Sequence, residues 1–231
     1  MPRLRFAVTD VFTTRRFCGN PLAVVLGADG LDTAQMQAVA REFGFSETSF
    51  VMRPEDPAHS AKVRIFTPAT EVPFAGHPNI GTAFVVARET AAPPARLVFE
   101  EAAGLVPLDI LSDSGTVTGA RLTAPEVLSI GAIYPRAALA EALHLDAADI
   151  AATLHEPMVA SVGLPFVMVE IASREALRRA RPDAAAFARL LPGDGLDAIY
   201  LYSRDFTPED GAVDWTARMF APGDGVAEDP A

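Results

Sequence analysis

Three segments in the first half of this chain recur in the second half, and this ordered repeat limits the possible folds more than any other feature. The first pair is a turn followed by an apolar strand, the second is a helix followed by a strand, and the third is an Arg-x-Phe strand that ends at a proline. The pairs are residues 19–25 with 163–169, 32–52 with 183–202, and 64–68 with 218–222. Chance similarities are not expected to keep their order. The repeat therefore predicts two copies of one α+β unit, with a ligand cleft between equivalent loops.

The hydrophobic pattern predicts mostly strands in the first copy. These expected strands are residues 4–12, 22–26, 48–52, 62–67, 96–100, 105–111 and 116–122. One helix is expected to begin after Asp32 and to end at Gly44, and another runs from His77 to Ala87. The stretch around Pro125 precedes helical, alanine-rich sequence. We therefore expect a first domain at residues 1–124 and a second domain at residues 125–231.

Composition excludes several classes of function. Of the 231 residues 50% are hydrophobic and 21% are charged, which is typical of a folded globular protein. A net charge of -11 argues against a nucleic-acid partner, because phosphate binding requires clustered Lys and Arg. We also expect no membrane partner and a cytoplasmic location, since no apolar run reaches about 18 residues and the start lacks signal-peptide features.

The cysteine and histidine content limits the chemistry further. Cys18 is the single cysteine, which excludes an intrachain disulfide and any catalytic pair of thiols. We expect it to be a buried structural thiol, because the sequence places no basic group where it would lower the pKa of this thiol. The four histidines are scattered, and no Cys/His cluster has the spacing of zinc ligands.

Two segments contain residues with the chemistry of a proton-transfer site. Gly76 to Gly81 enters a helix, where free amides attract an anion such as a carboxylate, although an ordinary turn fits the same residues. Glu47 lies between a helix end and an apolar strand. Burial there would raise the pKa of its carboxyl toward the value that a general acid or base needs, although a solvated loop glutamate also fits.

The two halves also contain candidate residues at corresponding places. His77 follows the first Arg-x-Phe strand and Asp229 follows the second, so we expect near-equivalent positions that face each other across the cleft. A lone histidine can equally be structural, and Asp229 can equally lie in an exposed tail. This arrangement would allow a substrate proton to be handled from two sides.

Five segments, in this order and spacing, resemble the phenazine-biosynthesis PhzF-like family. They are residues 10–13, 17–24, 45–50, 64–68 and 71–78. The resemblance covers essentially the whole chain and is strongest over residues 1–90 and 218–231. It implies the α+β fold of diaminopimelate epimerase, with two similar domains that each wrap a β-sheet around a central helix.

The resemblance also implies a function. It is that of a cofactor-independent isomerase or epimerase that shifts a proton on a small carboxylate-bearing substrate, the type reaction being isomerisation of trans-2,3-dihydro-3-hydroxyanthranilate. Glu47 is then the general acid/base, with His77 and Asp229 as its catalytic partners. The substrate-binding residues implied are Asn20, Ser46, Gly76, Pro78, Asn79 and Gly81. No metal, flavin or pyridoxal cofactor is implied, and a homodimer is expected.

One departure from the family concerns the second motif, which in the family continues beyond the position of Ala231. The second copy is therefore expected to be incomplete and to lack its central helix, either because the sequence is a fragment or because the product is truncated. An alternative function follows from this expectation, namely a non-catalytic interaction protein that retains the fold. The isomerase is the preferred hypothesis.

Overall fold

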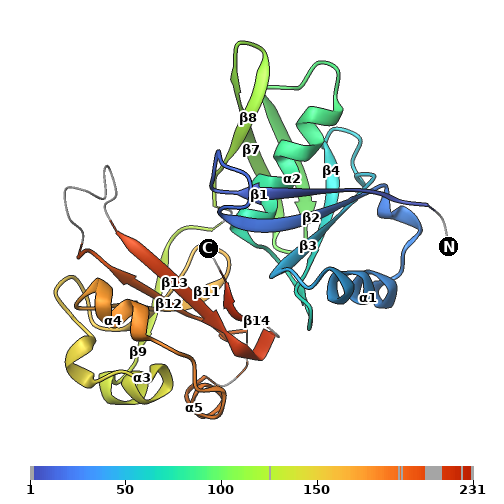
Figure 1. Ribbon diagram of the computed structural model, residues 1–231. Coiled ribbons are helices and arrows are strands. Elements are labelled where there is room, and N and C mark those ends of the chain that lie inside the picture. Colours follow the sequence, from blue (N-terminus) through green and yellow to red (C-terminus); the bar gives the residue numbers. More distant parts are fainter. Residues whose placement is uncertain are drawn as a thin grey trace. The chain divides into compact units, whose positions relative to one another are not determined.

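The computed structural model describes residues 3–124, 126–191, 193, 195–205, 215–224 and 226–229. The chain divides into two compact units, Met1–Pro125 and Glu126–Ala231 (Figure 1). Among the described residues, no helix has both the length and the apolar character that crossing a membrane requires.

The first unit contains all seven strands expected from the sequence, with ends that differ by at most two residues. Its elements are β1 (Arg5–Val11), β2 (Asn20–Leu26), the 3-10 helix η1 (Ala28–Gly30), α1 (Thr33–Phe43), β3 (Glu47–Met52), β4 (Ala61–Phe66), β5 (Glu71–Val72), α2 (Gly76–Glu89), β6 (Arg96–Glu101), β7 (Gly104–Asp113) and β8 (Thr116–Leu122). The short strand β5 is the one element of this group, besides η1, that the hydrophobic pattern did not predict.

Helix α1 begins and ends at the capping residues expected from the sequence. The Asp32 carboxylate accepts a hydrogen bond from the Gln35 amide at 2.8 Å, and the Gln35 side chain accepts one from the Asp32 amide at 3.1 Å. This reciprocal capping box satisfies two amides that the first turn cannot pair internally. Gly44 closes the helix in the left-handed conformation, with φ of 65°.

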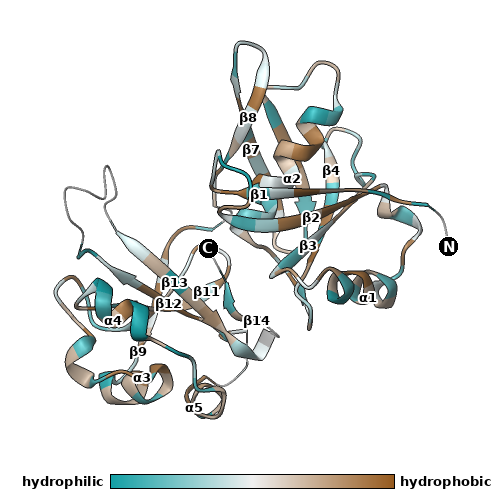
Figure 2. Ribbon diagram, viewed as in Figure 1, coloured by the Kyte–Doolittle hydropathy of each residue, from teal (hydrophilic) through white to brown (hydrophobic). Residues whose placement is uncertain are grey.

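The sheet of the first unit curls around α2. Its strand order is β1-β2-β3-β4-β6-β7-β8, with β5 paired to β4, and both edge strands contact α2. The middle of α2 carries the hydrophobic residues drawn in brown in Figure 2. Gly81 allows the close approach, because a Cβ at this position would lie 2.6 Å from Leu22 Cδ2 and 2.8 Å from Val11 Cγ2. The expected sheet around a central helix is therefore confirmed in this unit.

The second unit forms another sheet, with the strand order β14-β13-β12-β11-β10-β9. Its described elements are β9 (Ser129–Ile133), α3 (Arg136–Leu143), the 3-10 helix η2 (Ala147–Asp149), β10 (Met158–Ser161), β11 (Pro165–Glu170), α4 (Arg174–Arg179), α5 (Ala184–Leu190), β12 (Ile199–Ser203), β13 (Thr216–Ala221), the 3-10 helix η4 (Pro222–Asp224) and β14 (Val226–Asp229). The helices α3, α4 and α5 share one hydrophobic core with β11, β12 and β13.

The strand pairings confirm the duplication predicted from the sequence. From β1 to β4 the successive pairs are antiparallel, parallel and antiparallel. From β10 to β13 they follow the same pattern. The parallel pair requires a crossover connection in each unit, and this connection contains α1 in the first unit and α4 and α5 in the second. The described α-helices of the second unit all precede β12, whereas α2 follows β5, so none of them is the counterpart of α2.

Candidate functional site

Four of the residues predicted for the site meet in the first unit. Asn20 is the first residue of β2 and Glu47 is the first residue of β3, and these two strands run parallel with Leu22 opposite Glu47. Because neighbouring parallel strands start at the same edge of a sheet, the two side chains are brought close together. Ser46 precedes β3, and His77 lies in the first turn of α2.

A chain of hydrogen bonds joins these side chains. The Ser46 hydroxyl donates to Asn20 Oδ1 at 3.1 Å, and the amide Nδ2 of Asn20 donates to His77 Nδ1 at 3.1 Å. A neutral imidazole that accepts at Nδ1 carries its proton on Nε2. The Nε2 atom lies 3.4 Å from Glu47 Oε2. The chain therefore directs an N–H group toward the carboxylate of Glu47.

Burial determines the charge of His77. Its side chain is 5% exposed, and removal from water lowers the pKa of His77 to about 3. The imidazole is therefore neutral near pH 7, as the hydrogen bond from Asn20 requires. The side chain of Glu47 is 12% exposed, so its carboxylate is mostly sheltered from water.

The other predicted site residues of the first unit lie on α2, where they have different structural roles. The helix begins after Ala75, whose methyl side chain cannot cap the first amides. The side-chain amide of Asn79 donates back to the Ala75 carbonyl at 3.0 Å. Space is open where a Cβ on Gly76 would lie, whereas Gly81 packs against the sheet. Substrate binding by these residues and by the buried Pro78 stays a prediction.

Asp229 lies in the second unit, on β14, where it pairs with Met219 of β13. In the first unit the corresponding pairing joins Val72 of β5 to Ile65 of β4. The pairing of β13 with β14 is irregular between Met219 and Ala221. The near-equivalence of Asp229 and His77 therefore stays a prediction.

Sequence reasoning missed a buried carboxyl group next to α2. Glu101 ends β6, both of its carboxyl oxygens are out of contact with solvent, and the side-chain amide of Asn79 lies against them. Burial raises the pKa of Glu101 to about 8, although the nearby side-chain amide of Asn79 partly offsets this effect. Strand alternation could have revealed it, because Leu97 and Phe99 on the same face are buried.

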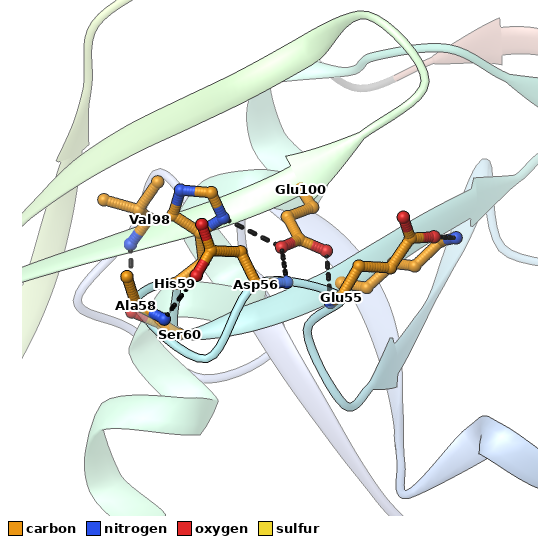
Figure 3. Close-up of polar contacts among 8 residues, drawn as sticks. Glu55, Asp56, Ala58, His59, Ser60, Val98 and Glu100 are labelled. Atoms are coloured by element: carbon orange, nitrogen blue, oxygen red, sulfur yellow. Dashed lines mark hydrogen bonds and ion pairs between the residues drawn. The ribbon is translucent and has the colours of Figure 1, made fainter.

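Glu100, the residue before Glu101, lies in a different environment, and Figure 3 shows its carboxylate next to the loop that contains Glu55, Asp56 and His59. Its carboxylate accepts hydrogen bonds from the backbone amides of Glu55 at 2.7 Å and Asp56 at 2.8 Å, and contacts His59 Nδ1 at 2.8 Å. These donors, led by the Glu55 amide, lower the pKa of Glu100 to about 2. Glu100 is therefore ionised at neutral pH, and its carboxylate holds the loop between β3 and β4 in place.

One prediction about an individual residue was wrong. Cys18 is exposed, although the sequence suggested a buried structural thiol. The loop between β1 and β2 projects its residues outward before the chain turns at Gly19, which has a φ of 77°. A Cβ on Gly19 would lie 2.2 Å from the Val11 carbonyl oxygen, so this turn specifically requires glycine.

Comparison with known proteins decides the family. The family model described as "Phenazine biosynthesis-like protein" (PhzC-PhzF) matches residues 9–231. The chain belongs to this family. The resemblance inferred from the sequence motifs is thereby confirmed.

Individual relatives agree with this assignment. An uncharacterized isomerase of Mesorhizobium japonicum is 40% identical, over 100% of this chain and 77% of the relative. The trans-2,3-dihydro-3-hydroxyanthranilate isomerase of Pseudomonas aeruginosa is 33% identical, over 98% of this chain and 75% of the relative. The crystal structure of a Bacillus anthracis phenazine biosynthesis protein of the PhzF family is 29% identical, with a TM-score of 0.81 over 100% of this chain and 76% of the other.

These relationships place the chain among the isomerases and epimerases of the PhzF-like family. The diaminopimelate epimerase-like fold expected from the motifs is confirmed as well. The alternative of a non-catalytic interaction protein is not favoured, because relatives that match nearly the whole chain are named isomerases.

Proposed function

We propose that this protein isomerises a small carboxylate-bearing substrate by moving a proton, with Glu47 as the general acid/base. The observation that carries the proposal is the contact between Glu47 Oε2 and His77 Nε2 at 3.4 Å. A carboxylate next to a buried neutral imidazole is sheltered from water but keeps a hydrogen-bond donor within reach. This is the environment in which a glutamate can both accept and return a proton.

In this proposal His77 orients Glu47 and does not itself carry charge. Because burial lowers the pKa of His77 to about 3, its neutral ring can donate from Nε2 to one carboxylate oxygen. The other oxygen is then directed toward the substrate. Asn20 accepts a hydrogen bond from the Ser46 hydroxyl and donates one to His77 Nδ1, and these two bonds fix the tautomer of His77.

The substrate carboxylate is proposed to bind at the start of α2. Gly76 and His77 carry backbone N–H groups in the first turn, and Ala75 offers them no side-chain acceptor. Amides at a helix N-terminus attract anions through the helix dipole. Asn79 reinforces this turn through its hydrogen bond to the Ala75 carbonyl.

The proposed reaction balances without a cofactor. A substrate C–H bond breaks, its proton passes to Glu47, and the electron pair delocalises into the adjacent conjugated system. A new C–H bond then forms when the proton is returned to a different carbon. The type reaction is the one named for the Pseudomonas aeruginosa relative, the isomerisation of trans-2,3-dihydro-3-hydroxyanthranilate.

Asp229 is proposed as a second acid/base group, contributed by the second of two domains at residues 1–124 and 125–231. It would assist Glu47 when the proton is returned to the second carbon. A homodimer and a cytoplasmic location also remain predictions.

The experiment compares conversion of trans-2,3-dihydro-3-hydroxyanthranilate by the wild type, Glu47→Gln and Glu42→Gln. Glu42 is exposed on α1 and is the matched control. Glu47→Gln preserves shape but cannot accept a proton, so turnover should fall by about 100-fold or more, whereas Glu42→Gln should keep it. Undiminished turnover by folded Glu47→Gln would overturn the assignment of Glu47.

A further inference from the structure

A partly buried arginine joins β4 to β5 in the first unit. Arg64 donates from Nε to Glu71 Oε1 at 2.7 Å and from Nη2 to Glu71 Oε2 at 2.6 Å. Its guanidinium also lies over the Phe66 ring, 5.1 Å from the ring centre. The side chain of Arg64 is only 22% exposed. This bidentate ion pair, stacked on an aromatic ring, is specific to arginine, because a lysine ammonium cannot form it.

The second unit repeats the same arrangement atom for atom. Arg218 donates from Nε to Glu228 Oε1 at 2.6 Å and from Nη2 to Glu228 Oε2 at 2.7 Å. Its guanidinium lies 4.7 Å from the centre of the Phe220 ring, and its side chain is 18% exposed. We call each pair, Arg64 with Glu71 and Arg218 with Glu228, an arginine clamp.

Each clamp is also tied to a helix of its own unit. Arg64 Nη2 donates to the hydroxyl of Thr33 in the first turn of α1 at 3.0 Å. Arg218 Nη1 donates to the carbonyls of Leu177 at 2.7 Å and Ala180 at 2.9 Å, where α4 ends. Helix-end carbonyls need such donors and are favoured by a nearby positive charge. Each guanidinium is therefore held by a helix of its unit as well as by the glutamate.

Each glutamate belongs to a short strand at the end of a β-hairpin pairing, β5 with β4 and β14 with β13. Strand β5 has two residues, and the chain passes from it to Gly76 and His77 within a few positions. Strand β14 has four residues, and its pairing with β13 is irregular between Met219 and Ala221. Glu228 immediately precedes Asp229 on β14. The clamp therefore restrains the residue that directly precedes Asp229.

We propose that Arg218 is a positioning residue that fixes the backbone of Asp229 through Glu228, and that Arg64 does the same through Glu71 for the chain entering α2. Neither arginine contacts the substrate in this inference. It rests on the proposed roles of Asp229 and His77. An exposed ion pair typically contributes little, but these two are partly buried, bidentate and anchored to helix ends.

The test compares Arg218→Lys with Arg189→Lys as the matched control. Arg189 also pairs with a glutamate, Glu141, but both side chains are well exposed at 63% and 68%. Arg218→Lys keeps the charge and loses the two-pronged contact. Because the clamp positions a proton-transfer group, kcat should fall about 10-fold or more while KM changes less than about 3-fold. Arg189→Lys should leave both constants unchanged.

Two further variants keep the inference testable. Glu228→Gln weakens the clamp from the other side, and in the double variant with Arg218→Lys the losses in kcat should not multiply, because both remove one interaction. Multiplying losses would overturn the inference, as would unchanged kcat in either folded single variant. Asp229→Asn distinguishes the positioning role of Arg218 from the proposed catalytic role of Asp229. If Asp229→Asn lowers kcat while the clamp variants do not, the positioning role of Arg218 is wrong. If Asp229→Asn leaves kcat unchanged, the proposed role of Asp229 is wrong.

Discussion

The buried carboxyl of Glu101 is expected to make the stability of the protein fall as pH rises through the neutral range. Its pKa is about 8 in the folded state against an ordinary value of 4.5. Below pH 4.5 the carboxyl is protonated in both folded and unfolded chains. Between pH 4.5 and pH 8 the unfolded chain loses this proton while the folded chain keeps it, so the free energy of unfolding decreases.

The size of this change in the free energy of unfolding follows from the difference between the folded and unfolded pKa values of Glu101. It corresponds to up to about 5 kcal/mol across the range, because each pH unit contributes about 1.4 kcal/mol. Glutamine has nearly the same shape and cannot ionise. The free energy of unfolding of Glu101→Gln, minus that of the wild type, should therefore increase by up to this amount from pH 4.5 to pH 8. Urea denaturation followed by circular dichroism measures it.

Glu100→Gln is the matched control on the adjacent residue. Backbone amides lower the pKa of Glu100 to about 2, so this carboxyl is ionised in both states across most of the range. Its contribution to stability is present above about pH 4.5 and is lost only as pH falls through about 2. The difference between wild type and Glu100→Gln should thus stay nearly constant. A constant difference for Glu101→Gln as well would refute the reasoning about burial.

Two other predictions concern α2. Gly81→Ala should destabilise the protein by about 1 to 2 kcal/mol, because overpacking against Leu22 and Val11 outweighs a gain in helix propensity of about 1 kcal/mol. Urea denaturation of this variant beside Gly76→Ala, where the new methyl meets nothing within 4 Å, checks it, and equal stabilities would contradict it. Because burial lowers the pKa of His77 to about 3, the wild type should lose stability as pH falls below 6.5, where only the unfolded chain binds the proton. His77→Gln should lose less over the same range, and equal losses in denaturation experiments would show that His77 does not cause the fall.

Much of the fold could be predicted because its signals are local or periodic. Asp32 and Gly44 marked the ends of α1, and the ordered repeat predicted the shared pairing pattern of β1–β4 and β10–β13. The strand β9 was not predicted, because its five residues are all exposed and show no alternation between buried and exposed positions. Its short length gave no pattern to recognise.

The candidate site was predictable in part, for a physical reason. Motif spacing identified Glu47 and His77, but only the parallel register of β2 and β3 brings Asn20 and Ser46 into one chain of hydrogen bonds with them. Cys18 was misplaced because a loop's outward direction depends on the turn at Gly19.

The most direct test of the central claim is solvent deuterium uptake by the product, measured by NMR with the isomerase substrate in D2O. The account predicts that the wild type introduces deuterium at one carbon and that Glu47→Gln introduces none, while Glu42→Gln behaves as the wild type does. Deuterium uptake by folded Glu47→Gln at the wild-type rate would contradict the claim that Glu47 moves the proton.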